Sequence, residues 1–213
     1  MLTGFLESKN IYQANFDLKI YLATSLTYFL FLFGRMLMEG KGIPEPAYAE
    51  AAAMLRVAVE ANVPQALHSM ALMYEYGHGV QQSFEEAQQL YKQAVEQHHV
   101  ESMFNLAMMH AQGRGDSHIQ DFGKARALLE QAAEANHAPA IYYIGVFKTY
   151  GYGCEVQYTQ AINWFERAAG LDDFRVSSKA AKAAAELRSK VDAANIYNER
   201  TMDQLQQAGG EPL

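Results

Sequence analysis

Residues 64–96 read PQALHSMALMYEYGHGVQQSFEEAQQLYKQAVE, and their pattern predicts the local structure of the chain. In its first part Ala66, Met70 and Met73 recur at helical spacing, which indicates one apolar stripe on an amphipathic helix. The Gly-His-Gly sequence at 77–79 ends this helix, because glycine accepts the left-handed backbone conformation favoured at a helix C-terminus. A second apolar stripe follows, on Phe84, Ala87, Leu90, Tyr91, Ala94 and Val95. The stretch therefore predicts two helices joined by a short turn.

The Gly-x-Gly signal recurs four times along the chain. The pairs are Gly40/Gly42, Gly77/Gly79, Gly113/Gly115 and Gly151/Gly153, whose first members stand 37, 36 and 38 positions apart. An apolar residue and then a small one precede each pair, as Phe33-Gly34, Met70-Ala71, Leu106-Ala107 and Ile144-Gly145. This period is typical of helical repeat arrays.

The residues after each pair repeat as well. An aromatic residue occupies one fixed position, at Tyr48, Phe84, Phe122 and Tyr158. Alanine occupies two more, at Ala51, Ala87, Ala125 and Ala161 and at Ala58, Ala94, Ala132 and Ala168. Alanine allows helix backbones to approach closely, and the aromatic side chain fills the remaining volume.

Each hairpin needs neighbours to bury its apolar surface, because a single hairpin cannot cover both of its faces. Stacked hairpins can. The predicted fold class is therefore all-α, a right-handed α-solenoid of about four helix-turn-helix repeats with a C-terminal capping helix. The predicted organisation is an N-terminal cap over 1–27, repeats over 28–170, and a capping helix with a tail over 171–213.

The pattern resembles the Sel-1-like repeat, a relative of the tetratricopeptide repeat. That family's unit runs A-x3-LG-x-[LM]-Y-x2-G-x-G-V, then an aromatic residue and A-x2-W-[YF]-x2-AA. The second repeat matches it from Ala66 to Ala94, and the fourth from Ala140 to Ala169. The resemblance covers residues 28–170.

A few positions depart from the family pattern. His110 and Lys148 stand where the family prefers tyrosine, and Asp116 replaces the valine after the third pair. These residues are expected to loosen the packing of repeats three and four. The first repeat departs most, with Phe29 at the position of a small residue.

The resemblance implies a protein-binding role. Sel-1-like repeat proteins act as adaptors in signalling, envelope assembly, host interaction and protein quality control, and bacterial members also serve as immunity proteins that neutralise a toxin. We therefore expect a non-enzymatic protein–protein interaction module, either an adaptor or scaffold or a partner-neutralising protein.

Composition narrows the class of protein. The chain has 213 residues, half of them apolar, which supports a packed core and argues against disorder. It carries 17 basic and 24 acidic residues, a formal charge of −7 that argues against nucleic acid and favours a basic partner. Cys154 is the only cysteine, so no disulfide forms within the chain, and the Cys-rich secreted branch of the family is excluded.

Residues 20–34 carry no charge. A membrane span needs about 20 such residues, and this run is bracketed after 15 by Lys19 and Arg35. Its end also keeps the register of the first repeat, so we expect a core segment of a cytoplasmic protein. The alternative is a periplasmic or membrane-anchored protein that uses this run as a signal or anchor.

The repeat pattern stops after Trp164. From Ser177 to about Gln207 an apolar set at helical spacing predicts the capping helix, on Ala180, Ala184, Leu187, Val191 and Ala194. A helix of this length can also extend beyond the repeats and contact a partner. The tail around Gly209-Gly210 is expected to be disordered.

No catalytic, cofactor or metal site is predicted. The seven histidines show no pair at metal-ligand spacing, and Cys154 has no nearby base that position can nominate. None of the glycine pairs extends to G-x-G-x-x-G or a phosphate-binding loop. An enzyme is therefore not expected.

A partner-binding surface is predicted on the first helices of the repeats. Positions 8, 5 and 1 residues before each glycine pair fall outside the packing stripe and form what we call the first-helix ladder. They hold Leu32, Arg35, Glu39, Ser69, Leu72, Tyr76, Asn105, Met108, Gln112, Tyr143, Val146 and Tyr150. The candidate binding residues among them are Arg35, Ser69, Leu72, Tyr76, Asn105, Met108, Gln112, Tyr143 and Tyr150. Such amphipathic residues suit a protein or peptide. The alternative is that Leu72, Met108 and Val146 pack between repeats.

Overall fold

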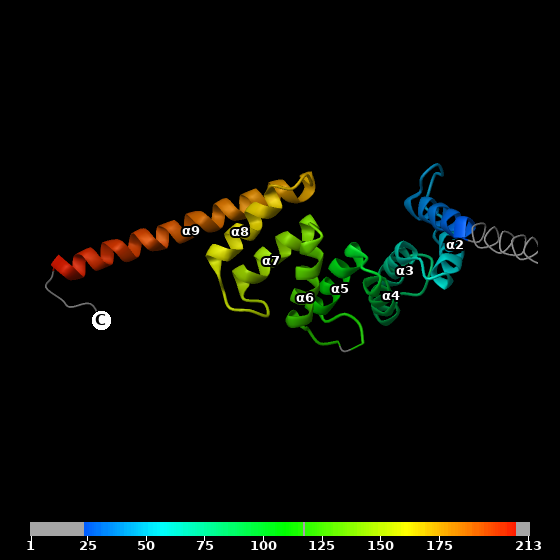
Figure 1. The fold of residues 1–213 in the computed structure, drawn as a ribbon, viewed down its shortest axis with the longest axis horizontal. Helices are drawn as coiled ribbons and strands as arrows, with labels where there is room; N and C mark the ends of the chain where they lie inside the picture. Colours follow the sequence, from blue (N-terminus) through cyan, green and yellow to red (C-terminus); the bar gives the residue numbers. More distant parts are fainter. Residues whose placement is uncertain (1–23, 117, 208–213) are drawn as a thin grey trace, which may run out of the picture. The chain divides into compact units, whose positions relative to one another are not determined.

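The computed structural model describes residues 24–116 and 118–207, which form helices and loops with no β-strand. One helix is described over residues 24–39. It is followed by α2 (Tyr48–Glu60), α3 (Pro64–Tyr76), α4 (Phe84–Glu96), α5 (Val100–Gln112), α6 (Phe122–Glu134), α7 (Ala138–Tyr150), α8 (Tyr158–Ala169) and α9 (Phe174–Gln207), labelled in Figure 1. The predicted all-α class, an array of helical hairpins followed by a C-terminal helix, is confirmed.

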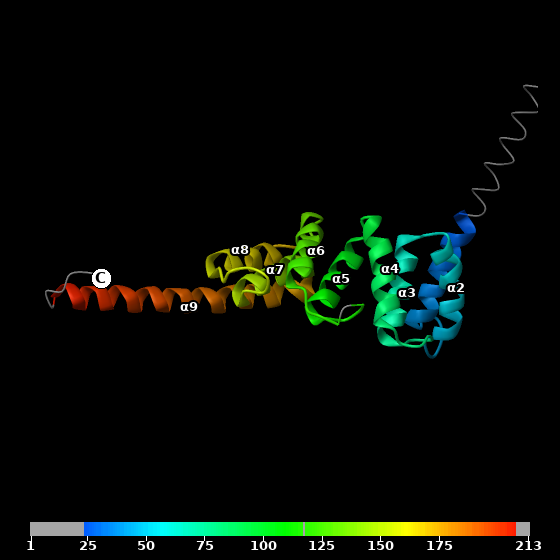
Figure 2. The same ribbon diagram turned by 90° about the horizontal axis from the view of Figure 1, so that it is seen from below.

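The chain divides into two compact units. Unit 1 comprises the residues up to Ser102 together with Arg114–His118, and in it α3 packs against both α2 and α4. Unit 2 comprises Met103–Gly113 and the residues from Ile119 onward. In unit 2, α7 packs against α6 and α8, and α8 packs against α9. Figure 2 shows these neighbours side by side within each unit.

The first helix of each repeat ends just before a glycine pair, as predicted. α3 ends at Tyr76 and α7 at Tyr150, and the next residues, Gly77 and Gly151, have φ angles of +71° and +73°. The Gly77 amide donates a hydrogen bond to the Met73 carbonyl, which satisfies an acceptor left free at the helix end.

The repeated alanines form the centre of each hairpin. All eight of them are fully buried. Gly145 plays a similar part in α7, because a Cβ added there would lie 2.7 Å from the Phe165 ring of α8. Larger side chains at these positions would force the helices apart, since protein cores are close-packed.

The second glycine of a pair packs against the preceding repeat. At Gly79, where φ is +68°, an added Cβ would lie 2.5 Å from the carbonyl carbon of Tyr48. At Gly153, where φ is +65°, it would lie 2.9 Å from that of Phe122. Tyr48 and Phe122 are the repeated aromatic residues that begin α2 and α6. The first glycine of a pair therefore ends one helix, and the second allows the loop to pack closely against the start of another.

The residue between the two glycines extends this contact. His78 stacks on Tyr48 with ring centroids 4.5 Å apart, and Tyr152 stacks on Phe122 at 4.8 Å. The Arg114 guanidinium lies 5.2 Å from the ring centroid of Phe84. Three chemically different side chains thus make one equivalent contact between successive repeats.

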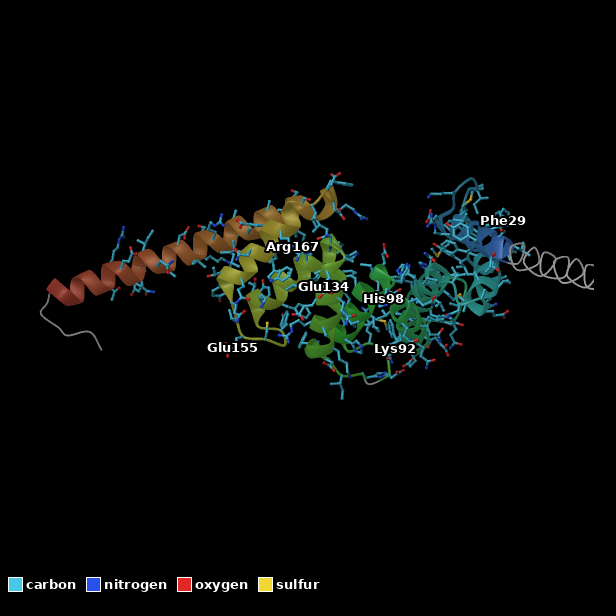
Figure 3. The ribbon with its side chains drawn as sticks, in the orientation of Figure 1. Phe29, Lys92, His98, Glu134, Glu155 and Arg167 are labelled. Atoms are coloured by element: carbon cyan, nitrogen blue, oxygen red, sulfur yellow. The ribbon has the colours of Figure 1, made fainter. Side chains whose placement is uncertain are left out.

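Two residues that depart from the family pattern make polar contacts of their own. Asp116 forms an ion pair with Lys92 of α4, labelled in Figure 3, at 3.1 Å. Its amide also donates to Gln88 Oε1 at 3.2 Å. The Lys148 ammonium donates to Gln157 Oε1 at 3.0 Å. These polar contacts stabilise the loops of repeats three and four, the two repeats in which looser packing was expected.

Ser83 caps the N-terminus of α4, because its hydroxyl accepts a hydrogen bond from the Glu86 amide at 3.2 Å. Ser83→Ala is expected to lower the free energy of unfolding by about 1 kcal/mol. Chemical denaturation followed by circular dichroism measures the loss. Ser178→Ala, an exposed serine inside α9, is the matched control and is expected to be neutral. Equal effects from the two variants would contradict the capping role.

The C-terminal helix α9 begins at Phe174, three residues before the predicted start. Ala180, Ala184 and Leu187 are buried, and the last two pack with Ile162 and other residues of α8. The predicted apolar set is wrong at its end, because Ala194 is exposed. Residues 192–200 are all exposed, since the helix has there passed the hairpin that it covers. Figure 1 shows this extension.

The helix over residues 24–39 is only partly covered. Phe31 is buried, and a Cβ added to Gly34 would lie 3.1 Å from Leu55, which places this helix against α2. Phe33 is 41% exposed, whereas its equivalent Met70 is 2% exposed. The assignment of Phe33 to the packing stripe is therefore wrong, because no second helix of an earlier repeat covers it among the described residues.

No helix among the described residues is long and apolar enough to span a membrane. Residues 20–23 of the uncharged run, most of the predicted N-terminal cap over 1–27, and the glycine tail lie outside the described residues.

Candidate functional site

In unit 1, four ladder residues, Arg35, Glu39, Ser69 and Leu72, border a cavity of about 300 Å³ between the helix over 24–39 and α3. Arg35 reaches it and forms an ion pair with Glu39 at 3.3 Å. Leu72 lines it and is partly buried. Ser69 is only 4% exposed, and its hydroxyl donates to the Gln65 carbonyl at 2.8 Å. Ser69 therefore offers little surface to a partner, because its polar group is already bonded within its own helix.

Tyr76 lies at the end of α3 and is 58% exposed. Its ring stacks on His78 with centroids 5.8 Å apart. Tyr76 is thus held in place by the glycine loop and remains available to a partner.

A pair of histidines lines the unit 1 cavity. The His68 ring lies 5.0 Å from that of His99 and 5.8 Å from that of Tyr91. Burial lowers the pKa of His68 to about 4, with the neighbouring His99 adding to the shift and Glu101 opposing it. Burial also lowers the pKa of His99, whose Nδ1 lies 3.0 Å from the Ser102 hydroxyl. Both rings are therefore neutral at pH 7.

In unit 2, the ladder residues of α5 differ in exposure. Asn105 and Met108 are partly buried, whereas Gln112 is exposed. On α7, Tyr143 is partly buried and its ring lies 5.6 Å from that of Phe104. Tyr150 is 65% exposed.

The ladder of α7 meets α9 in one cavity of about 370 Å³. Tyr143, Val146 and Tyr150 line it from α7, and Lys179 and Lys190 line it from α9. A second cavity of about 420 Å³ shares Thr149, Tyr150, Leu187 and Lys190 with the first and continues to Tyr158, Val191, Ala194 and Asn195. We call the two together the α7–α9 groove.

The contribution of α9 to this groove was not predicted. The sequence pattern assigned only an apolar stripe to this helix, with Ala180, Ala184 and Leu187 among its members, and gave the lysines no role. Lys179 directly precedes Ala180 of that stripe, and Lys190 lies three positions after Leu187. Their position at the edge of the apolar stripe was the sequence signal that could have placed both lysines near the groove. Val146 packs against the α8–α9 core, which favours the packing alternative for this residue.

No group of three or more His, Cys, Asp or Glu side chains in the described part of the chain is placed to hold a metal ion. Cys154 is a partly buried free thiol that lies 3.7 Å from the Phe147 carbonyl.

Helical hairpins that repeat with glycine-closed loops and buried alanines define a tandem α-hairpin repeat protein. The family model of the Sel1 repeat matches residues 28–63, 64–99, 100–137 and 138–173. The chain therefore belongs to the Sel1 repeat family. Such proteins are generally non-enzymatic scaffolds that bind other proteins.

The solved structures similar to this chain include two whose folds can be compared in detail. One is c5321, a protective antigen of uropathogenic Escherichia coli strains with an SLR fold, at 25% identity and a TM-score of 0.63 over 68% of this chain. The other is a Sel1 repeat protein from Oxalobacter formigenes, at 26% identity and a TM-score of 0.66 over 74%. The match spans 31% of the first protein and 63% of the second, less than two thirds of each. No curated protein matches the sequence significantly.

Proposed function

We propose that this protein is a non-enzymatic adaptor or partner-neutralising protein that binds another protein on its first-helix ladder. One observation carries the proposal: Tyr143 and Tyr150, two candidate binding residues of one repeat, line a single cavity. Tyrosines combine a large apolar surface with a polar tip and are enriched at interaction hot spots. Tyr76 in unit 1 offers a further exposed ring of the same kind.

Partner capture tests this function. The double variant Tyr143→Ala, Tyr150→Ala is expected to reduce recovery of the natural partner by at least about tenfold, because hot-spot truncations cost about 2 kcal/mol or more. Affinity purification with quantitative mass spectrometry measures the recovery. Tyr197→Ala removes a ring that is 71% exposed on α9 and lines neither cavity of the groove, and is the matched control. Unchanged recovery by a folded double variant would refute the role of the ladder.

The location of the protein belongs to the same proposal, which places it in the cytoplasm. An envelope-associated protein is the second candidate, favoured by the exposed apolar residues Leu26, Phe29, Phe33 and Met36 on the helix over 24–39. Fractionation of cells that express the full chain, with sequencing of the mature N-terminus, separates the two. A processed N-terminus in the envelope fraction would replace the cytoplasmic proposal.

A further inference from the structure

The α7–α9 groove combines aromatic walls, an apolar floor and two lysines. We propose that it binds an extended acidic segment of the partner, with one carboxylate near Lys179, one near Lys190 and an apolar side chain between them. This inference rests on the proposed function and adds the chemistry of the partner. The formal charge of −7 on the whole chain favours a basic partner, so the groove differs locally from the rest of the protein.

The two lysines lie on the same side of α9. They are 11 positions apart, close to three helical turns, so their Cα atoms are separated by about 16 Å along the helix. The Lys179 ammonium lies 4.9 Å from the ring centroid of Tyr142, which holds it at the cavity wall. Lys190 lines both cavities and stands where they join. An anionic group thus meets a fixed cation in the first cavity and another at the junction.

Among the described residues, Glu186 is the one acidic side chain that lines either cavity, and it forms an exposed ion pair. Its carboxylate lies 3.8 Å from the Lys182 ammonium, one turn away on α9. The lining therefore carries two lysines against one paired carboxylate. An acidic segment gains attraction from this arrangement and a basic one does not.

The groove also offers an apolar floor between the lysines. Phe165 and Leu187 are buried there, and Val146 and Val191 pack beside them. An apolar side chain of the partner that reaches this floor would gain the free energy of burial. The tyrosine walls supply amphipathic contact surface on either side.

The spacing of the two lysines fits an extended segment. An extended chain advances about 3.3 Å per residue, so two carboxylates about five positions apart span the distance between the lysines.

Defined peptides test the inference on the full chain. The probe is a fluorescein-labelled peptide of about ten residues with two aspartates about five positions apart and a leucine midway. Two matched peptides replace the aspartates with asparagines or with lysines. Fluorescence anisotropy is expected to show saturable binding of the aspartate peptide alone, with affinity falling as salt is added.

Charge reversal locates the binding. The double variant Lys179→Glu, Lys190→Glu is expected to bind the aspartate peptide at least about tenfold more weakly. Arg200→Glu makes the same reversal at an exposed position of α9 outside the groove and is expected to bind as the wild type does. Loss of binding in the control, or retention in the double variant, would overturn the inference.

The remaining outcomes separate this inference from the proposed function. If the tyrosine double variant loses its natural partner but no peptide binds, or the lysine peptide binds as well, the function stands and the acidic chemistry is wrong. If the tyrosine variant retains its partner while the aspartate peptide binds as expected, the ladder role fails and the groove chemistry holds. Self-association that competes with the peptide and is lost on charge reversal would assign the groove to a second copy and overturn the inference.

Discussion

Gly79→Ala is expected to lower the free energy of unfolding by roughly 3 to 5 kcal/mol, the largest effect of any glycine-to-alanine change in the described part of unit 1. Two costs combine at this position. A left-handed backbone, here with φ of +68°, costs a residue with a Cβ about 1 to 2 kcal/mol. The new methyl would also meet the Tyr48 backbone at 2.5 Å, far inside van der Waals contact. Because the obstacle is backbone at the start of α2, it cannot move aside as a side chain can.

Gly42→Ala isolates the first cost from the second. Its φ is +80°, yet an added Cβ would meet nothing within 4 Å. This variant is expected to lose only about 1 to 2 kcal/mol. Denaturation followed by circular dichroism, with hydrogen exchange of α2 to α4, measures both variants. Equal losses would show that the approach of Gly79 to Tyr48 contributes nothing to stability.

Acidification is expected to destabilise unit 1 through His68. The folded pKa of about 4 lies below the unfolded value of 6.5, so the unfolded chain binds more protons between these two values. The stability is therefore fully present above pH 6.5 and is lost as pH falls toward 4. The loss reaches about 3 kcal/mol at pH 4. His99, whose pKa burial also lowers, shifts stability in the same direction.

His68→Phe keeps a ring in this site and removes the proton. The variant is expected to lose markedly less stability than the wild type between pH 6.5 and 4. Hydrogen exchange of α3 and α4 across this range measures the difference within unit 1. His78→Phe makes the same exchange at an exposed position and serves as the control for ring replacement. Identical pH dependence in His68→Phe and wild type would contradict the role of His68.

The architecture of the repeat could be predicted from the sequence because its signals are local. Helical spacing links residues three or four positions apart, and a glycine marks a helix end through its own backbone freedom. The ends of α3 and α7 at Tyr76 and Tyr150 follow from these rules. Because these signals recur in four repeats, each helix and helix end was supported by its equivalents.

The same reasoning found one role for the glycine pairs and missed the other. Helix termination explains Gly77 and Gly151, whose φ angles are positive. Gly79 and Gly153 have no room for a Cβ, because the backbone of the preceding repeat, about 30 positions earlier, lies against them. No local pattern reports such a contact. The exposure of Phe33 has a similar cause, since its surroundings depend on a neighbour rather than on helical phase.

The period, the hairpins, the buried alanines and the positions of the first-helix ladder all follow from the sequence alone. Tertiary packing set which ladder residues are exposed, as Tyr150 is, and which are buried, as Ser69 is, with its hydroxyl bonded to its own helix. It also brought Lys179 and Lys190 of α9 beside Tyr143 and Tyr150 of α7. The physical reason is that helical phase sets which side of a helix is apolar. The packing of helices that are far apart in the sequence determines which residues this side and its edge contact.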